Sequence, residues 1–169
     1  MRLDAAFFRR DVLEAAPNLV GAVLFYRLPD GRVLSGRITE TEAYRGQEDL
    51  ACHARFGRTA RTDMLYREGG YSYVYLVYGL HWLFNVVTGE ENTPQGVLIR
   101  AMDRPLDGPA KWTKAFGITG GHNGLYLPDS QEIWIEKDGD APVRSAPRVG
   151  VDYAGEPWKS IPWRFILDA

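Results

Sequence analysis

The chain has 169 residues, with 45% hydrophobic and 25% charged residues and a formal net charge of −2. This length predicts one domain, residues 1–169, around a buried core. The negative net charge argues against a nonspecific nucleic-acid binder. No apolar run approaches the ~20 residues that span a bilayer, so we expect no membrane contact. The single cysteine and the lack of a secretion signal predict an intracellular protein, in the cytoplasm or nucleoid.

The predicted elements are mostly strands. Asp4 is expected to cap a helix over residues 5–16 that Pro17 ends. Strand patterns follow at 22–28, 33–41, 71–77, 82–87, 97–102, 132–136, 148–151 and 163–167, with a second helix over 109–116. The polar stretch 46–70 is predicted to be a long ordered loop with one short helix. This pattern predicts an α+β fold, with a curved, largely antiparallel sheet, few helices and long loops.

The second strand of the first hairpin carries two acids and an aromatic residue at alternate positions. Glu40, Glu42 and Tyr44 would share one face, because side chains alternate along a strand. Two carboxylates about 6.6 Å apart, from ~3.3 Å per residue, can catalyse glycosyl transfer to water. Spacing alone favours the other interpretation, in which they are surface acids or caps of the next loop. A general base must stay ionised, and Arg100 is the candidate cation beside it.

Tyrosines dominate the strand at 71–77. Tyr71, Tyr73 and Tyr75 share parity, which suits cross-strand packing or a stacking platform for single-stranded nucleic acid. Tyr78 breaks this parity and lies beside Gly79 at the expected hairpin tip. A large ring at a tip has little core to join, and such rings can open a base stack as wedges.

The sequence predicts neither a metal site nor a cofactor. The three histidines, His53, His81 and His122, lack the spacing of metal ligands. The glycines near position 120 lack the lysine of a phosphate-binding loop.

Several motifs occur together in order, in a series that is far more specific than any one of them: Thr39–Tyr44, His53, Tyr73–Gly79, Asn85, Val97–Ala101, Arg148–Val151 and Trp163–Phe165. With these motifs the chain resembles the alkyladenine (3-methyladenine) DNA glycosylase family, over about Leu13 to Phe165. The chain departs from the family pattern at the short segment Asp103–Asp107, in the loop 58–63 and in its short termini. These departures bear on affinity and substrate range.

The resemblance implies a role for each matching residue. Glu42 would activate the water, which Arg100 and the backbone carbonyl of Val149 would help to hold, and Glu40 would have no catalytic role. The residues implied to bind the extruded base are Tyr44, His53 and Tyr75 as pocket walls, backbone groups near Ala51 and His53, and Asn85, which would exclude guanine. Tyr78 would fill the gap left in the duplex.

The expected function is that of a monofunctional DNA glycosylase. It would flip a damaged purine out of duplex DNA and hydrolyse the N-glycosidic bond, leaving an abasic site for base excision repair. Its partner would be double-stranded DNA carrying such a purine, bound by a monomer. Arginines outnumber lysines sixteen to four, and Arg55, Arg58, Arg61 and Arg67 are candidate contacts to the DNA backbone. The alternatives are an inverting glycosidase or nucleoside hydrolase that uses Glu40 and Glu42, and a non-enzymatic single-strand binder.

Overall fold

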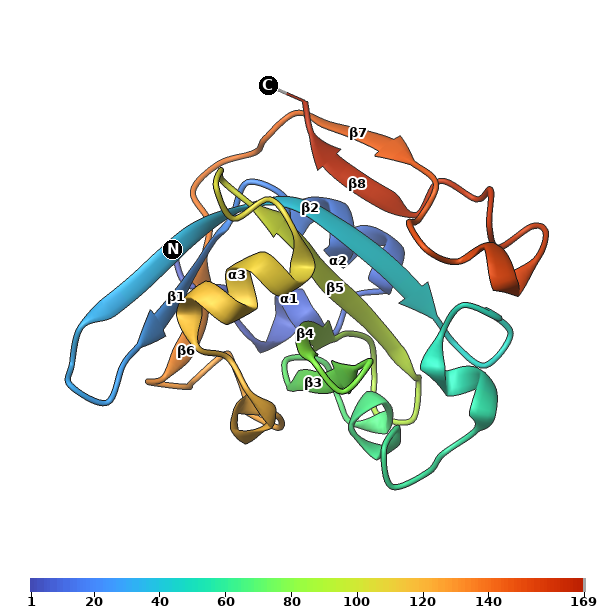
Figure 1. Cartoon of the computed structure of the whole chain (residues 1–169), viewed down its shortest axis with the longest axis horizontal. Coiled ribbons are helices and arrows are strands. Elements are labelled where there is room, and N and C mark those ends of the chain that lie inside the picture. The colour runs from blue at the N-terminus through green and yellow to red at the C-terminus, as the bar shows by residue number, and fades with distance from the viewer. Residues whose placement is uncertain (169) are drawn as a thin grey trace.

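The computed structural model describes residues 1–168, folded around a curled antiparallel sheet (Figure 1). The strands are β1 (Val23–Arg27), β2 (Val33–Arg45), β3 (Ser72–Val77), β4 (His81–Val87), β5 (Gln95–Met102), β6 (Ile133–Glu136), β7 (Val143–Ala146) and β8 (Arg164–Leu167). Their order is β3-β4-β5-β2-β1-β6, with β8 paired to β2 and β7 paired to β8. The predicted α+β class and the curved antiparallel sheet are confirmed.

The long strand β2 organises the sheet, because β1, β5 and β8 all pair with it. Its register with β5 is irregular around Glu40. Beyond this point Thr41 and Ala43 are buried, and the Thr41 hydroxyl donates to the Ala16 carbonyl in α2 at 2.8 Å. Glu42 and Tyr44 therefore lie on the opposite face, as the alternation of a strand requires.

Two helices pack on the sheet. The helix α2 (Val12–Leu19) contacts β2 and β5, and α3 (Pro109–Phe116) contacts β4 and β5. The predicted single helix over 5–16 is wrong. A separate α1 (Ala5–Phe8) comes first, because Asp4 and Asp11 each cap a helix through a side-chain oxygen. No helix within residues 1–168 is long and apolar enough to cross a membrane.

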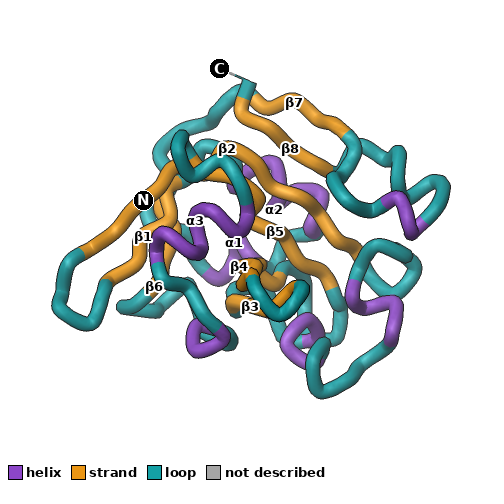
Figure 2. The backbone as a smooth tube through the Cα atoms, viewed as in Figure 1, coloured by secondary structure: helices purple, strands orange, loops and turns teal. Residues whose placement is uncertain are grey.

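Two loop regions meet on one side of the sheet (Figure 2). The loop after β2 contains two short 3-10 helices, η1 (His53–Phe56) and η2 (Asp63–Tyr66), where one was predicted. A third, η3 (Gly120–His122), follows α3. The segment after β7 contains η4 (Asp152–Ala154). The predicted strand at 148–151 is wrong, because Gly150 has a left-handed φ of 74° and the segment turns. The strand that was missed is β7.

Candidate active site

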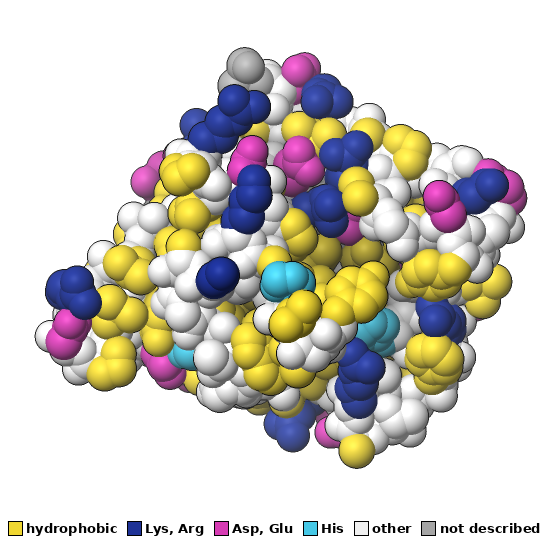
Figure 3. All heavy atoms as spheres, in the orientation of Figure 1, with side chains coloured by type: hydrophobic (Ala, Val, Ile, Leu, Met, Phe, Trp, Pro, Cys, Tyr) yellow, Lys and Arg dark blue, Asp and Glu magenta, His cyan; other side chains and the backbone are white. Residues whose placement is uncertain are grey.

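A cavity of about 210 Å³ opens where β2, β3, β4 and β5 meet the two loop regions. Figure 3 shows this face hollowed, with hydrophobic side chains in the hollow and Lys or Arg side chains around it. The lining includes all five residues predicted to bind the base, Tyr44, Ala51, His53, Tyr75 and Asn85, and also Tyr78 and Val149. Segments far apart in the sequence therefore come together as the motif series predicts.

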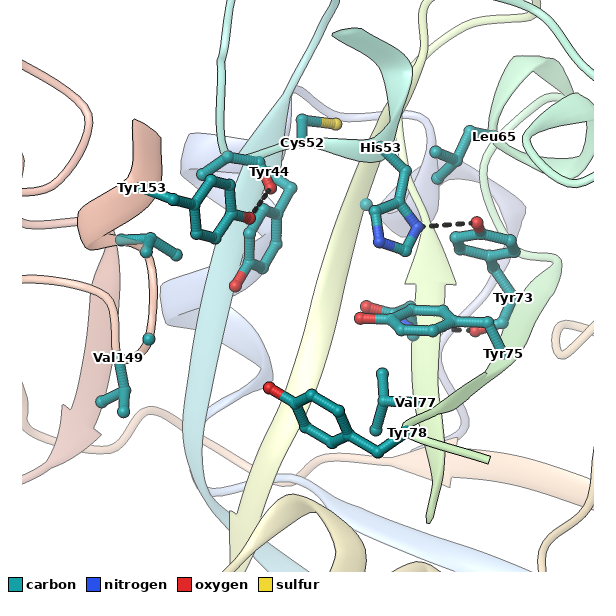
Figure 4. A pocket seen from close by; sticks show the side chains of 15 residues that line it. Tyr44, Cys52, His53, Leu65, Tyr73, Tyr75, Val77, Tyr78, Val149 and Tyr153 are labelled. Carbon is teal, nitrogen blue, oxygen red and sulfur yellow. Dashed lines mark hydrogen bonds between the residues drawn. The ribbon is translucent and has the colours of Figure 1, made fainter. Parts of the chain in front are cut away.

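Aromatic rings form two walls of the cavity. Tyr44 lies on one side, and His53 and Tyr75 lie on the other (Figure 4). The His53 and Tyr75 ring centroids are 4.5 Å apart, and Tyr73 supports Tyr75 from 5.3 Å. A flat ligand would fit between the two walls and contact π-faces on both sides.

His53 is held as a neutral ring. Burial, together with the charges of Arg61 and Arg55, lowers its pKa to about 4. Its Nδ1 lies 2.9 Å from the Tyr73 hydroxyl. With this pKa, the site has no imidazolium charge near neutral pH.

Glu42 lies behind the Tyr44 wall and has no exposed surface. Its Oε1 accepts a hydrogen bond from the Tyr44 hydroxyl at 2.8 Å, and its Oε2 accepts one from the Val149 N–H at 2.7 Å. The Arg100 guanidinium is 3.7 Å from Oε1. Two donors and a cation are the surroundings of a carboxylate anion. Val149 thus contacts Glu42 through its N–H, and the role of its carbonyl stays a prediction.

Glu40 has different partners. Arg164 lies 3.3 Å from its Oε2, and Arg100 lies 4.0 Å away, between the two acids. Both acids therefore face Arg100, as the alternation of the strand predicts. Glu42 bonds two residues of the cavity lining, Tyr44 and Val149, whereas Glu40 bonds none of them.

Arg148 and Asp49 connect the two loop regions through a buried ion pair. Both guanidinium Nη atoms donate to the Asp49 carboxylate, at 2.6 and 3.0 Å, and neither side chain is exposed. Arg148 also donates to the Ala43 carbonyl and lies 4.9 Å from the Tyr44 ring centroid. It adjoins Val149, so this pair fixes the peptide N–H that contacts Glu42.

Tyr78 lies at the tip of the β3–β4 hairpin and lines the mouth of the cavity (Figure 4). Its side chain is 92% exposed, so it belongs to no core. Its φ of 52° is left-handed, an uncommon conformation for a tyrosine. Gly79 follows with φ 65°, and Leu80 N–H closes the turn on the Val77 carbonyl.

Asn85 and Ala51 both line the cavity, with part of their hydrogen-bonding capacity already used. The Asn85 amide donates to the Tyr73 carbonyl, which fixes the orientation of the side chain. The Ala51 N–H donates to Asp49, and the Ala51 carbonyl accepts from the Tyr153 hydroxyl at 3.4 Å. The Ala51 N–H is therefore not free for a ligand in this structure.

The four candidate arginines do not form one patch. Arg55 and Arg61 lie close to aromatic residues of the cavity lining, Tyr153 and Tyr75 respectively. Arg58 pairs with Asp63, and both line a separate depression that also contains Arg67 and Glu68. No cluster of three or more His, Cys, Asp or Glu side chains suited to a metal occurs in the described part of the chain.

Sequence reasoning missed three contributions to the site. Tyr73 orients His53, Tyr153 lines the cavity, and Asp49 neutralises Arg148. Two of these residues lie within or just beyond recognised motifs, at Tyr73–Gly79 and after Arg148–Val151. Asp49 carries no local signal, because its partner is far away in the sequence.

Comparison with known proteins identifies the family of the chain. The family described as Methylpurine-DNA glycosylase (MPG) matches residues 6–169. A Clostridium botulinum protein named "Putative 3-methyladenine DNA glycosylase" is 39% identical, with 99% of this chain and 96% of the relative covered. Relatives of the same name from Anaeromyxobacter and Methanocella arvoryzae are 43% and 42% identical, with 99% and 96% of this chain and 90% of each relative covered. The chain therefore belongs to the methylpurine-DNA glycosylase family.

Proposed function

We propose that this protein is a monofunctional DNA-3-methyladenine glycosylase that acts on damaged purines in duplex DNA. The observation that carries the proposal is Glu42, a buried carboxylate held by two donors and Arg100 directly behind an aromatic cavity. The family and the names of the relatives support the substrate class.

The aromatic walls suit a cationic base. A purine inside the duplex is out of reach, so it must first be extruded, at a cost of a few kcal/mol. Alkylation at N3 or N7 gives the purine a positive charge. Stacking between Tyr44 and the His53–Tyr75 wall then gains a cation–π contribution of about 0.5–2 kcal/mol. The low pKa of His53 favours this binding, because a charged imidazole would repel the ligand.

Glu42 would act on water as the general base. Because it is fully buried, the attacking water must enter the space between Tyr44 and Val149, whose groups already hold the carboxylate. A cationic base leaves without being protonated, so one carboxylate is sufficient. None of the lysines within residues 1–168 lines the cavity, which agrees with water as the nucleophile.

The geometry favours this mechanism over the alternatives. An inverting glycosidase would need Glu40 as a second acid in the site, but Glu40 is paired with Arg164 and contacts no lining residue. A single-strand binder would have no use for a buried Glu42 beside Arg100.

The test uses duplexes that each carry one lesion: 3-methyladenine, 7-methylguanine, hypoxanthine or ethenoadenine. Wild-type protein should convert at least one of them to an abasic site, scored by alkaline cleavage. Glu42→Gln should bind that duplex but release the base at least ~100-fold more slowly, and Glu40→Gln should retain most of the activity. No excision of any lesion by the wild type would contradict the proposal. Equal losses in the two variants would restore the two-carboxylate mechanism.

A further inference from the structure

Beside the cavity, an arginine lies between two exposed aromatic rings. The Arg55 guanidinium is 4.3 Å from the Phe56 ring centroid and 5.0 Å from that of Tyr153. Phe56 is 65% exposed and Tyr153 is 64% exposed. Arg55 and Phe56 come from η1, and Tyr153 comes from η4. We call these three residues the rim platform.

Folding does not account for the exposure of these rings. Phe56 and Tyr153 belong to none of the hydrophobic clusters, and Leu50 and Val149 in the same two loop regions are exposed as well. Apolar side chains gathered at the edge of a binding cavity, among polar residues, typically mark an interaction surface.

The charge of the rim platform suits a nucleic-acid strand. One of the five N–H groups of Arg55 donates a hydrogen bond to the Leu50 carbonyl, at 2.6 Å. Glu48 and Asp152 are exposed in the same regions, but Arg55 forms no ion pair with either within residues 1–168. A guanidinium with free donors can bind a phosphate, and the rings beside it can stack on bases or pack on sugars.

The rim platform is continuous with the cavity. Tyr153 and Val149 line the cavity, and Tyr153 lies next to Tyr44, away from Tyr78 (Figure 4). An extruded nucleotide stays covalently joined to its neighbours on both sides. The DNA strand that carries the extruded nucleotide must therefore cross the edge of the cavity on both sides of that nucleotide. Tyr78 can contact the strand on one of these sides only.

We infer that the rim platform binds the lesion-carrying strand on one side of the extruded nucleotide. Arg55 contacts a flanking phosphate, while Phe56 and Tyr153 pack against the adjacent sugar or base. This inference rests on the proposed function, since it takes DNA as the ligand. It adds a contact surface made by η1 and η4, separate from the hairpin tip.

The experiment measures binding and single-turnover excision with a hypoxanthine or ethenoadenine duplex that the wild type excises. Phe56→Ser and Tyr153→Ser are combined in one variant, and Val33→Ser, an exposed apolar residue of the β1–β2 hairpin, is the matched control. The double variant should bind about tenfold more weakly, as expected for the loss of one stacked base. Tyr153→Phe, which keeps the ring, should lose much less binding than the double variant, and all variants should melt at the wild-type temperature.

Shortened duplexes identify the side of the contact. Wild-type affinity should fall when the flank on one side of the lesion is trimmed to two base pairs, and the double variant should be insensitive to that trimming. If the wild type excises the lesion but the double variant binds every duplex as tightly as the wild type does, the rim platform does not contact DNA. That result would point to a protein partner and overturn the inference. If the wild type excises nothing, the proposed function itself fails.

Discussion

Arg148 and Asp49 form a two-pronged ion pair that is completely buried and joins the two loop regions around the cavity. Arg148 packs on the Tyr44 ring and directly precedes Val149, whose N–H contacts Glu42. The Tyr44 wall and the Glu42 carboxylate thus share one buried anchor.

Removing one partner of this pair should strongly destabilise the fold. Asp49→Asn would leave the Arg148 charge buried without a counter-ion, at a cost of about 3–5 kcal/mol in the free energy of unfolding. Asp63→Asn breaks the exposed Arg58 pair and should cost no more than about 1 kcal/mol. Urea denaturation of both variants compares them. Equal losses would mean that the buried pair does not anchor the loops.

Tyr78→Ala should weaken the binding of a lesion duplex and slow excision by about tenfold, within the ~1–3 kcal/mol that a stacked ring contributes. The ring would fill the gap left by the extruded nucleotide and so offset part of the unstacking cost. The melting temperature should not fall, because the side chain is exposed. Single-turnover excision of one lesion, paired, mispaired and unpaired, checks this. The loss should be smallest for the unpaired lesion, and an equal loss on all three would argue against a wedge.

Acid should destabilise the protein through His53. Burial lowers its pKa to about 4, from an ordinary value of 6.5. Between these values the unfolded chain binds a proton that the folded chain does not, so stability falls as the pH drops from about 6.5 to about 4. Above pH 6.5 this contribution is constant. Urea denaturation at pH 7, 5.5 and 4 should show a smaller loss for His53→Gln, with His81→Gln at the exposed hairpin as the control. A parallel loss in the wild type and His53→Gln would assign the acid sensitivity to other groups.

DNA binding should depend on salt despite the negative net charge. Each neutralised phosphate contributes about −0.9 to the log–log slope of affinity against salt. Arg55 and Arg61 lie beside the cavity, whereas Arg58 and Arg67 share a depression with acids. Changing the first pair to glutamine should therefore reduce the slope more than changing the second pair. An unchanged slope after all four substitutions would show that the DNA lies elsewhere.

The sequence predicted the elements whose boundaries are set by local chemistry. Helix α3 begins at Pro109 and ends before Gly117, which has a left-handed φ of 77°, as the proline–glycine pattern indicates. The first hairpin turns at Asp30 and Gly31, as predicted. By contrast, Asp4 and Asp11 are both good caps, and the sequence did not reveal that each begins its own helix.

Contacts between distant segments could not be predicted from local patterns. The Val149 N–H reaches Glu42 because Gly150 turns the chain, whereas the apolar run at 148–151 favoured a strand. The Arg148–Asp49 pair joins segments that the sequence treats as unrelated loops. The motif series nevertheless named residues that line one cavity, and their individual roles stay predictions.

The left-handed backbone of Tyr78 has a consequence for protein engineering. A tyrosine in this conformation costs of order 1 kcal/mol or more, and the free protein already bears that cost before any DNA is present. Glycine or asparagine would relieve it. A library selected only for heat resistance should therefore enrich glycine or asparagine at position 78. A library selected for lesion binding should keep the aromatic ring, so the two selections would diverge at this one residue.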